Sequence, residues 1–196
     1  MKGKFIVIDG SDGLGKTTLI EGLKKEYKDK YIFLNDPSMD LPLSKKIRRI
    51  RQESCNNINP TIDLLLTLAA RKELTDYIKS KLENGNNVIC DRYILSTYAY
   101  QGKYFKMYMI MYLHYKLNLE VRPDLTILLT REKPYREEIN DSIEKVYSFE
   151  ETNSNYKKLY ENEYMNNIYG IKKIELKEKT REEILEEAKE LIKSIG

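Results

Sequence analysis

Residues 10–17 combine three glycines with a lysine and a threonine, a set of residue types suited to holding a phosphate group. They read Gly-Ser-Asp-Gly-Leu-Gly-Lys-Thr and complete the pattern G-x-x-x-x-G-K-[ST]. In such a loop successive backbone N–H groups surround a phosphate, and the glycines allow the tight curl. Lys16 would then reach the β- and γ-phosphates of a nucleotide, and the Thr17 hydroxyl would ligate Mg²⁺.

The segments on either side of this loop supply the context that the motif requires. The apolar run Lys4–Asp9 predicts a buried strand, and Thr17–Lys28 predicts a helix. A chance match in a glycine-rich turn is the alternative, and the strand–loop–helix order argues against it. The predicted phosphate-binding residues are Gly10, Ser11, Asp12, Gly13, Leu14, Gly15, Lys16, Thr17 and Thr18.

A second chemical segment begins where the apolar run 87–91 ends in Asp91-Arg92 and a helical pattern follows. An aspartate at a strand end near a phosphate loop can hold Mg²⁺, usually through water, so Asp91 is a candidate metal ligand. The neighbouring Arg92 can clamp a phosphate with two hydrogen bonds and neutralise its charge. A structural Asp–Arg pair at the strand end is the alternative.

Strand-like and helix-like segments alternate along the chain, so the elements that must position these residues can be predicted. The expected strands are Lys4–Asp9, Tyr31–Leu34, Asn87–Asp91, Leu125–Thr130 and Ile171–Glu175. The expected helices are Thr17–Lys28, Leu43–Gln52, Pro60–Asn84, Leu95–Gln101, Lys103–Leu119, Phe149–Asn166 and Thr180–Ile195. This alternation predicts an α/β fold of three layers, with a parallel sheet of about five strands between two layers of helices, and the complete phosphate loop makes it the P-loop NTPase type.

Ligands of such folds bind beyond the carboxyl ends of the strands. Asp36-Pro37, Asp91-Arg92 and the phosphate loop all lie at predicted strand ends, and so we expect them to share one site. The polar segment 131–148 is weakly periodic and predicts a short lid, with a solvated connection as the alternative.

Composition narrows the range of functions. The 196 residues suit one domain over 1–196, and 34 basic against 31 acidic residues give a net charge of +3. This balance does not favour nucleic acid as a partner, and no run of about 18 apolar residues predicts a membrane span. Two cysteines without metal-ligand spacing suit a reducing cytoplasm, and one histidine argues against a histidine-based triad or zinc site.

Several segments together resemble the thymidylate kinase family. Residues 91–102 are close to the family's D-R-[YH]-x-x-S-T-x-A-Y-Q-G, and residues 5–18 resemble its first strand and phosphate loop. Residues 65–71 resemble L-L-F-x-A-x-R, residues 42–48 resemble P-L-G-x-x-I-R, and residues 122–126 resemble the P-D-L-T-I strand. The segments occur in family order and cover residue 4 to about residue 160.

The resemblance implies phosphoryl transfer from ATP, with Mg²⁺, to dTMP, and a homodimer. Asp12 would face the 3′-hydroxyl of the monophosphate, and Arg48 and Arg92 would hold its phosphate. Arg71 would hydrogen-bond a pyrimidine carbonyl. The remaining residues implied around the nucleoside are Ser96, Thr97, Tyr100 and Gln101. From residue type alone, Arg48 also fits a solvated basic run and Tyr100 also fits a packing role.

The chain departs from the family pattern at two substrate positions. The family's R-E-P-G is Asn35-Asp36-Pro37-Ser38 here, which keeps an acid at Asp36 and the bend at Pro37. The aromatic residue four positions before the base-reading arginine is Thr67, so a platform for stacking on thymine is lost. By analogy with stacked nucleic-acid bases, this loss costs about 1–3 kcal/mol, and it puts the preference for thymine in question.

The cation that stabilises the transition state is a third open point. Some family members carry an arginine at the position of Gly13, and others use an arginine-rich lid. We therefore expect Arg136 in the lid to act with Lys16, Arg92 and Asp12 in catalysis, although solubilising charges are an equal alternative.

Other functions remain open from the sequence. They are a kinase for another nucleotide, a deoxynucleoside kinase, and a nucleotide-binding regulator without activity. The intact Lys16 and Thr17 oppose the regulator, and Asp91-Arg92-Tyr93 disfavours the nucleoside kinase.

Overall fold

The computed structural model describes residues 2–54, 57–135 and 147–196. The strands are β1 (Phe5–Asp9), β2 (Tyr31–Asn35), β3 (Asn87–Asp91), β4 (Leu125–Thr130) and β5 (Ile171–Glu175). The helices are α1 (Lys16–Tyr27), α2 (Pro42–Ser54), α3 (Pro60–Glu83), α4 (Ile94–Gln101), α5 (Met107–Lys116), α6 (Phe149–Glu161), α7 (Glu163–Tyr169) and α8 (Arg181–Lys193).

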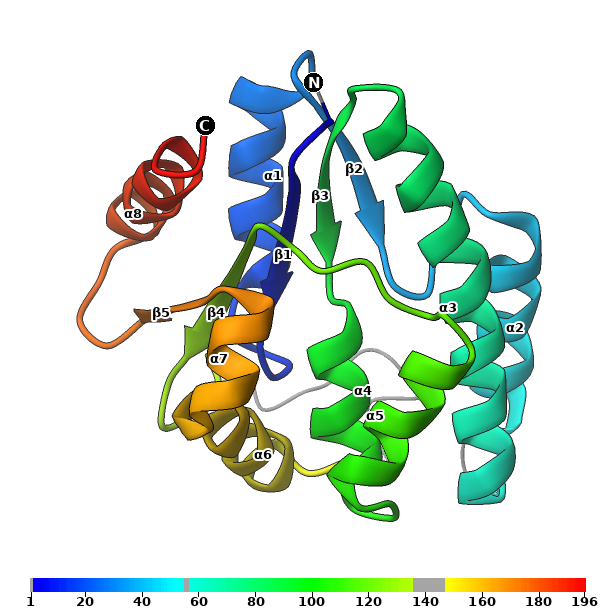
Figure 1. Ribbon diagram of the computed structural model, residues 1–196. Helices are drawn as coiled ribbons and strands as arrows, with labels where there is room; N and C mark the ends of the chain where they lie inside the picture. Colours follow the sequence, from blue (N-terminus) through cyan, green and yellow to red (C-terminus); the bar gives the residue numbers. More distant parts are fainter. Residues whose placement is uncertain (1, 55–56, 136–146) are drawn as a thin grey trace.

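The strands form one parallel sheet in the order β2-β3-β1-β4-β5 (Figure 1). The first strand lies in the middle, and Val7 is in register with Cys90 on one side and Thr126 on the other. Because β1 is paired on both edges and all five of its side chains are buried, the loop that follows it starts from a fixed point.

Alternate residues of the strands pack into two separate cores. Phe5 and Val7 belong to the core formed with α3–α7, whereas Ile6 and Ile8 belong to the core formed with α1 and α8. Apolar residues on both faces are what a sheet covered on both sides requires. The predicted three-layer α/β fold is therefore confirmed.

Two predicted helices differ from the structure. The helix expected over Phe149–Asn166 is two helices, because Asn162 has an extended backbone and its side chain accepts a hydrogen bond from the Met165 amide, which starts α7. The helix expected over Lys103–Leu119 is shorter, because the Gln101 carbonyl accepts the amides of Tyr104 and Phe105 in a turn that precedes α5.

The predicted lid over 131–148 falls mostly on residues 136–146, and these, with Arg136, lie outside the described residues. In the part of the chain that is described, we find no helix with the length and apolar character needed to span a membrane.

Candidate functional site

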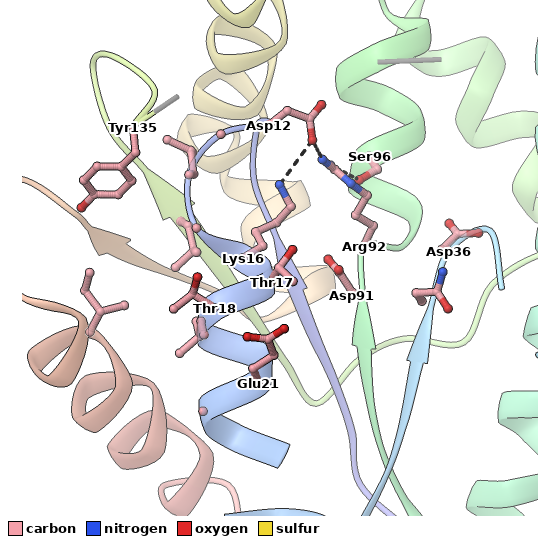
Figure 2. Close-up of a pocket in the computed structure, with 18 of the residues that line it drawn as sticks. Asp12, Lys16, Thr17, Thr18, Glu21, Asp36, Asp91, Arg92, Ser96 and Tyr135 are labelled. Atoms are coloured by element: carbon pink, nitrogen blue, oxygen red, sulfur yellow. Dashed lines mark hydrogen bonds and ion pairs between the residues drawn. The ribbon is translucent and has the colours of Figure 1, made fainter. Parts of the chain in front are cut away.

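One cavity of about 1390 Å³ lies at the carboxyl ends of β1, β2 and β3. Clefts of about 300–1,000 Å³ hold one small ligand, so this volume suits two. Residues 12–18 of the phosphate loop line it, with Asp36, Arg92 and Ser96 on one side, Tyr135 on the other and Glu21 further along α1 (Figure 2). The loop therefore lies between two arms of the cavity.

The backbone of the phosphate loop needs its glycines. Gly10, Gly13 and Gly15 have φ of 141°, 75° and 80°, in a region where side chains are disfavoured. A Cβ atom at Gly10 would lie 2.7 Å from the Leu129 carbonyl oxygen of β4. Gly15 caps α1 without a side-chain hydrogen bond, and no acidic residue occupies the first turn of that helix. The N-terminal amides of α1 are thus arranged to receive an anion.

Lys16 lies across the phosphate loop. Its Nζ donates to the Ser11 carbonyl oxygen at 2.7 Å and lies 3.6 Å from Asp12 Oδ1. The side chain is largely buried, with 7% of the residue exposed. These contacts hold the ammonium group over the loop, where a phosphate bound to the backbone amides would meet it.

Arg92 joins the end of β3 to the phosphate loop. Its backbone has φ of 65°, which is unusual for a side-chain-bearing residue and marks a constrained position. Nη1 donates to the Gly10 carbonyl oxygen at 3.0 Å, and Nη2 is bonded to Asp12. The guanidinium lies 5.2 Å from the ring centroid of Tyr100, whose hydroxyl also donates to Asp12. A phosphate acceptor next to the loop would therefore meet a fixed arginine.

A buried cluster lies beneath Arg92. The Tyr156 hydroxyl is 2.6 Å from Asp9 Oδ1 and 2.8 Å from Ser96 Oγ, and it accepts from Arg92 Nη1 at 3.3 Å. The pKa of Tyr156 is well above its ordinary value, because burial and the Asp9 charge both disfavour the phenolate. This cluster connects β1, α4 and α6 to the arginine.

Asp91 and Thr17 are the candidate metal ligands. Figure 2 shows them reaching toward the same region from the end of β3 and the start of α1. Asp91 Oδ1 is buried, and among the described residues it has no hydrogen-bond partner. The pKa of the Asp91 carboxyl is raised, mainly by burial, although Arg92 and Lys16 attract its charge. A buried carboxylate oxygen next to a hydroxyl is a donor set that suits Mg²⁺.

The far end of one arm of the cavity is built by α3 and α4. Arg71 donates from Nη2 to Asp36, to the Tyr93 carbonyl oxygen at 3.0 Å and to Thr97 Oγ1 at 3.2 Å. Its guanidinium also lies 4.6 Å from the centroid of the Tyr93 ring. These contacts fix the Arg71 guanidinium in place between α3, α4 and the end of β2.

The other arm lies against Tyr135 and the start of α8. The Tyr135 amide donates to the Gly13 carbonyl oxygen at 2.9 Å, and its hydroxyl donates to the Leu176 carbonyl oxygen at 3.2 Å. Arg131 lies over the Tyr135 ring, 3.9 Å from its centroid. This arm combines an aromatic ring with the apolar side chains of Ile184 and Leu185.

Comparison with known proteins then decides the family. The family model described as thymidylate kinase matches residues 8–191. The chain belongs to the thymidylate kinase family. The resemblance predicted from the sequence is therefore confirmed.

Curated members of the thymidylate kinase family match part of the chain. The thymidylate kinase of Marinomonas sp. (strain MWYL1) is 40% identical over 111 residues, which is 53% of this chain and 50% of the relative. That of Mycoplasma genitalium is 40% identical over 107 residues, 52% of this chain and 50% of the relative. The chain thus matches about half the length of these relatives.

Two solved thymidylate kinases share the fold. The crystal structure from Ehrlichia chaffeensis has a TM-score of 0.73 at 22% identity and covers 98% of this chain and 100% of that one. The structure from Candida albicans has a TM-score of 0.74 at 20% identity and covers 98% and 92%. At these identities the likeness establishes the fold.

The cavity brings together the site residues predicted from the family resemblance. Those that line it beside the loop are Asp36, Pro37, Arg48, Thr67, Arg71, Asp91, Arg92, Ser96, Thr97, Tyr100 and Gln101. Gly10 and Ser11 precede the lining residues of the loop and do not line the cavity themselves, and Ser11 is fully buried. This clustering does not by itself test the role of any residue, so the roles remain predictions.

The sequence reasoning missed several residues of this family member's cavity. Arg51 and Tyr147 line it, and Asp63 of α3 contacts both of them. Asp63, Thr67 and Arg71 are spaced four residues apart, which places them on one face of a helix. That spacing was the available signal, because it puts Asp63 on the helix face that carries Arg71, and a carboxylate buried there needs a hydrogen-bond or charge partner.

Proposed function

We propose that the chain transfers a phosphoryl group from ATP to a deoxynucleoside monophosphate, with dTMP converted to dTDP as the first expectation. The observation that carries this proposal is one cavity in which Arg48 and Arg92 lie beside a complete phosphate loop. Membership of the thymidylate kinase family supports the same reaction.

The residues around the cavity have different roles in this reaction according to their positions. The loop amides and Lys16 hold the β- and γ-phosphates of ATP, and Arg92 and Arg48 hold the acceptor phosphate. An oxygen of the acceptor attacks the γ-phosphorus, the bond to the β-phosphate oxygen breaks, and ADP leaves. The acceptor is already an anion, so no general base is needed, and catalysis is positioning together with charge stabilisation. Asp12, bonded to Arg92 and Tyr100, holds the arginine and meets the sugar.

Thr17 and Asp91 would hold Mg²⁺ with the bound ATP. The buried Oδ1 of Asp91, which has no hydrogen-bond partner among the residues that the structure describes, supports this assignment. When bound, the ion neutralises charge on the phosphates. Among the described residues, Arg92 and Lys16 attract the negative charge of Asp91.

The test is ADP release from ATP and Mg²⁺, coupled to a spectroscopic readout, with dTMP, dUMP, dCMP, dGMP and thymidine supplied separately. Turnover with dTMP that is lost in Lys16→Ala and falls at least about 10²-fold in Arg92→Ala is the expected result. Near-normal turnover in either folded variant would contradict the mechanism.

The same assay separates the other functions. Turnover with another monophosphate would keep the chemistry and change the base, which Thr67 in place of an aromatic residue makes a specific alternative. Turnover with thymidine alone would indicate a nucleoside kinase. ATP binding without release of ADP for any acceptor would indicate a regulator.

The homodimer is also part of the proposal. Apolar side chains of α3 and α5 are exposed, including Leu65, Tyr108 and Tyr112 with 58%, 69% and 58% of their surface accessible. Exposed apolar patches of this kind mark interfaces. Light scattering on the purified chain should give twice the 23.2 kDa mass, and Leu65→Glu/Tyr112→Glu should give a monomer.

A further inference from the structure

The part of the cavity built by α3 and α4 contains three side chains that are joined to one another by hydrogen bonds. The proposed phosphoryl transfer does not use them directly. Gln101 Nε2 of α4 donates to Asp63 Oδ2 of α3 at 2.6 Å and to the Tyr147 hydroxyl at 3.2 Å. The Tyr147 hydroxyl in turn donates to Asp63 Oδ2 at 3.3 Å. Asp63 and Gln101 are 4% and 2% exposed, so these hydrogen bonds are shielded from water.

Asp63 is itself held by Arg51 of α2. The Arg51 guanidinium donates from Nε to Oδ1 at 2.6 Å and from Nη2 to Oδ2 at 3.2 Å. Figure 1 shows α2 and α3 side by side, with α4 next to α3. A two-point arginine contact fixes the plane of the carboxylate, and a carboxylate only accepts hydrogen bonds.

This arrangement decides which way round the Gln101 amide lies. An amide has a donor end and an acceptor end, and only the donor end can face a carboxylate. Both hydrogens of Nε2 are used by Asp63 and Tyr147. The remaining atom, Oε1, is buried and has no partner among the described residues, although Gln101 lines the cavity. The unused capacity of this amide is therefore that of an acceptor.

Arg71 lies two helical turns after Asp63 on α3 and supplies hydrogen-bond donors that complement the Gln101 acceptor. Its Nη2 contacts Thr97, which lies one turn before Gln101 on α4. Its Nε and Nη1 have no hydrogen-bond partner in the described part of the chain. Thr67 lies between Asp63 and Arg71 and also lines the cavity, and its hydroxyl donates to the Asp63 carbonyl oxygen at 2.8 Å. The part of the cavity between α3 and α4, here called the slot, thus has the donors of Arg71 at one end and the acceptor of Gln101 at the other.

We infer that Asp63 is a positioning residue that fixes the Gln101 amide with its oxygen toward the ligand. The slot then binds pyrimidines that carry a carbonyl next to an N–H more tightly than it binds cytosine. Thymine and uracil have this acceptor–donor edge at O4 and N3, and cytosine has the reverse. Two buried hydrogen-bond donors that face each other, or two buried acceptors, are strongly unfavourable. A site with fixed donors and acceptors therefore discriminates between two bases far better than apolar contact does. The inference rests on the proposed function only for the kind of ligand, and it supplies a basis for preferring thymine without an aromatic residue at position 67.

The test compares two nucleotides that differ only at the edge in question, dTMP and 5-methyl-dCMP, by calorimetric binding in the absence of ATP. The wild-type chain should bind dTMP at least tenfold more tightly. In Asp63→Asn, the asparagine oxygen faces Arg51 and its amide faces Gln101, which turns the Gln101 amide over. The preference for dTMP should then fall at least tenfold, to near equality or below.

Matched variants separate positioning from folding. Arg51→Gln keeps the carboxylate against Gln101 and should keep the preference. If Asp63→Asn folds poorly because Arg51 is left unpaired, Arg51→Gln/Asp63→Leu removes both charges together with the acceptor of Gln101 Nε2, and the preference for dTMP should again fall toward equality. Thermal unfolding checks that each variant is folded.

Several outcomes would decide the matter. Equal weakening of both nucleotides in Asp63→Asn, with the ratio unchanged, would overturn the inference, as would equal binding by the wild-type chain. If the wild-type chain prefers dTMP and Asp63→Asn does not, but no acceptor is phosphorylated, the proposed function fails and the inference stands.

Discussion

Nη1 of Arg92, at the end of β3, donates to the carbonyl oxygen of Gly10, the first residue of the phosphate loop, at 3.0 Å. The contact fixes the arginine relative to the loop before any ligand binds. The sites proposed for donor and acceptor phosphates are therefore held together by the protein backbone, which reduces the ordering that binding requires.

Arg92→Lys should separate charge from geometry. Lysine keeps the positive charge but loses the planar fork that contacts Gly10 and Asp12 together. We expect kcat/KM for dTMP to fall about 10²-fold, with KM for ATP changed less than threefold. Steady-state rates with each substrate varied in turn measure both. Arg49→Lys on the exposed side of α2 is the control, since Arg49 contacts only Glu53 among its described neighbours.

Tyr156→Phe should weaken acceptor binding without touching the cavity wall. The Tyr156 hydroxyl connects Asp9, Ser96 and Arg92, and its removal leaves the ring in place. One lost buried hydrogen bond is worth about 1.4 kcal/mol, or tenfold in kcat/KM for dTMP. The effect should appear in KM for dTMP and not in KM for ATP. Tyr160→Phe on the same helix is the matched control, and equal effects from both would contradict a specific role for Tyr156.

The sequence predicted those parts of the fold that depend on local pattern. Apolar runs between helical patterns predicted all five strands, and the helix expected over Thr180–Ile195 begins with a capping box of Thr180 and Glu183. The break at Asn162 was missed because its side-chain cap competes with an otherwise continuous helical pattern.

The site was predicted where residues belong to a local motif and missed where partners come from distant segments. Asp63 contacts Gln101, 38 residues away, and Tyr156 contacts Asp9, 147 residues away. No periodicity in one chain reports such a pair, because the contact exists only after the helices pack on the sheet. Arg71 could be predicted from the family motif, but its pairing with Asp36 required the structure.

Glu73→Gln should loosen the start of α2, the helix that carries Arg48 and Arg51. The Glu73 carboxylate accepts the amides of Leu43 and Ser44 at 3.1 and 2.7 Å and acts as an N-cap from α3. The pKa of Glu73 is lowered, since the hydrogen bonds from Ser44 and Leu43 outweigh the cost of burial. We expect a loss of about 1 kcal/mol in the free energy of unfolding at pH 7, measured by urea denaturation.

The Glu73 effect has a defined pH dependence. Because the folded-state pKa is the lower one, the contribution is present above the unfolded value and is lost as the pH falls through the folded value. The difference between wild type and Glu73→Gln should therefore shrink below about pH 4.5. Glu83→Gln, at the exposed end of α3, should change stability by less than about 0.5 kcal/mol at any pH.

His114, the chain's one histidine, should make the fold sensitive to mild acid. Burial, with a smaller effect from Arg71, lowers the pKa of His114 to about 3, and Nδ1 is bonded to the Ile110 carbonyl oxygen at 2.8 Å. From about pH 6.5 downward the unfolded chain binds a proton that the folded chain does not, so stability falls by up to about 1.4 kcal/mol per pH unit. His114→Phe keeps an aromatic ring against Tyr98 and removes the group whose protonation in the unfolded chain lowers stability. Urea denaturation at pH 7, 6 and 5 should show the wild type losing up to about 2 kcal/mol more than the variant between pH 7 and 5, and parallel losses would contradict a buried neutral histidine.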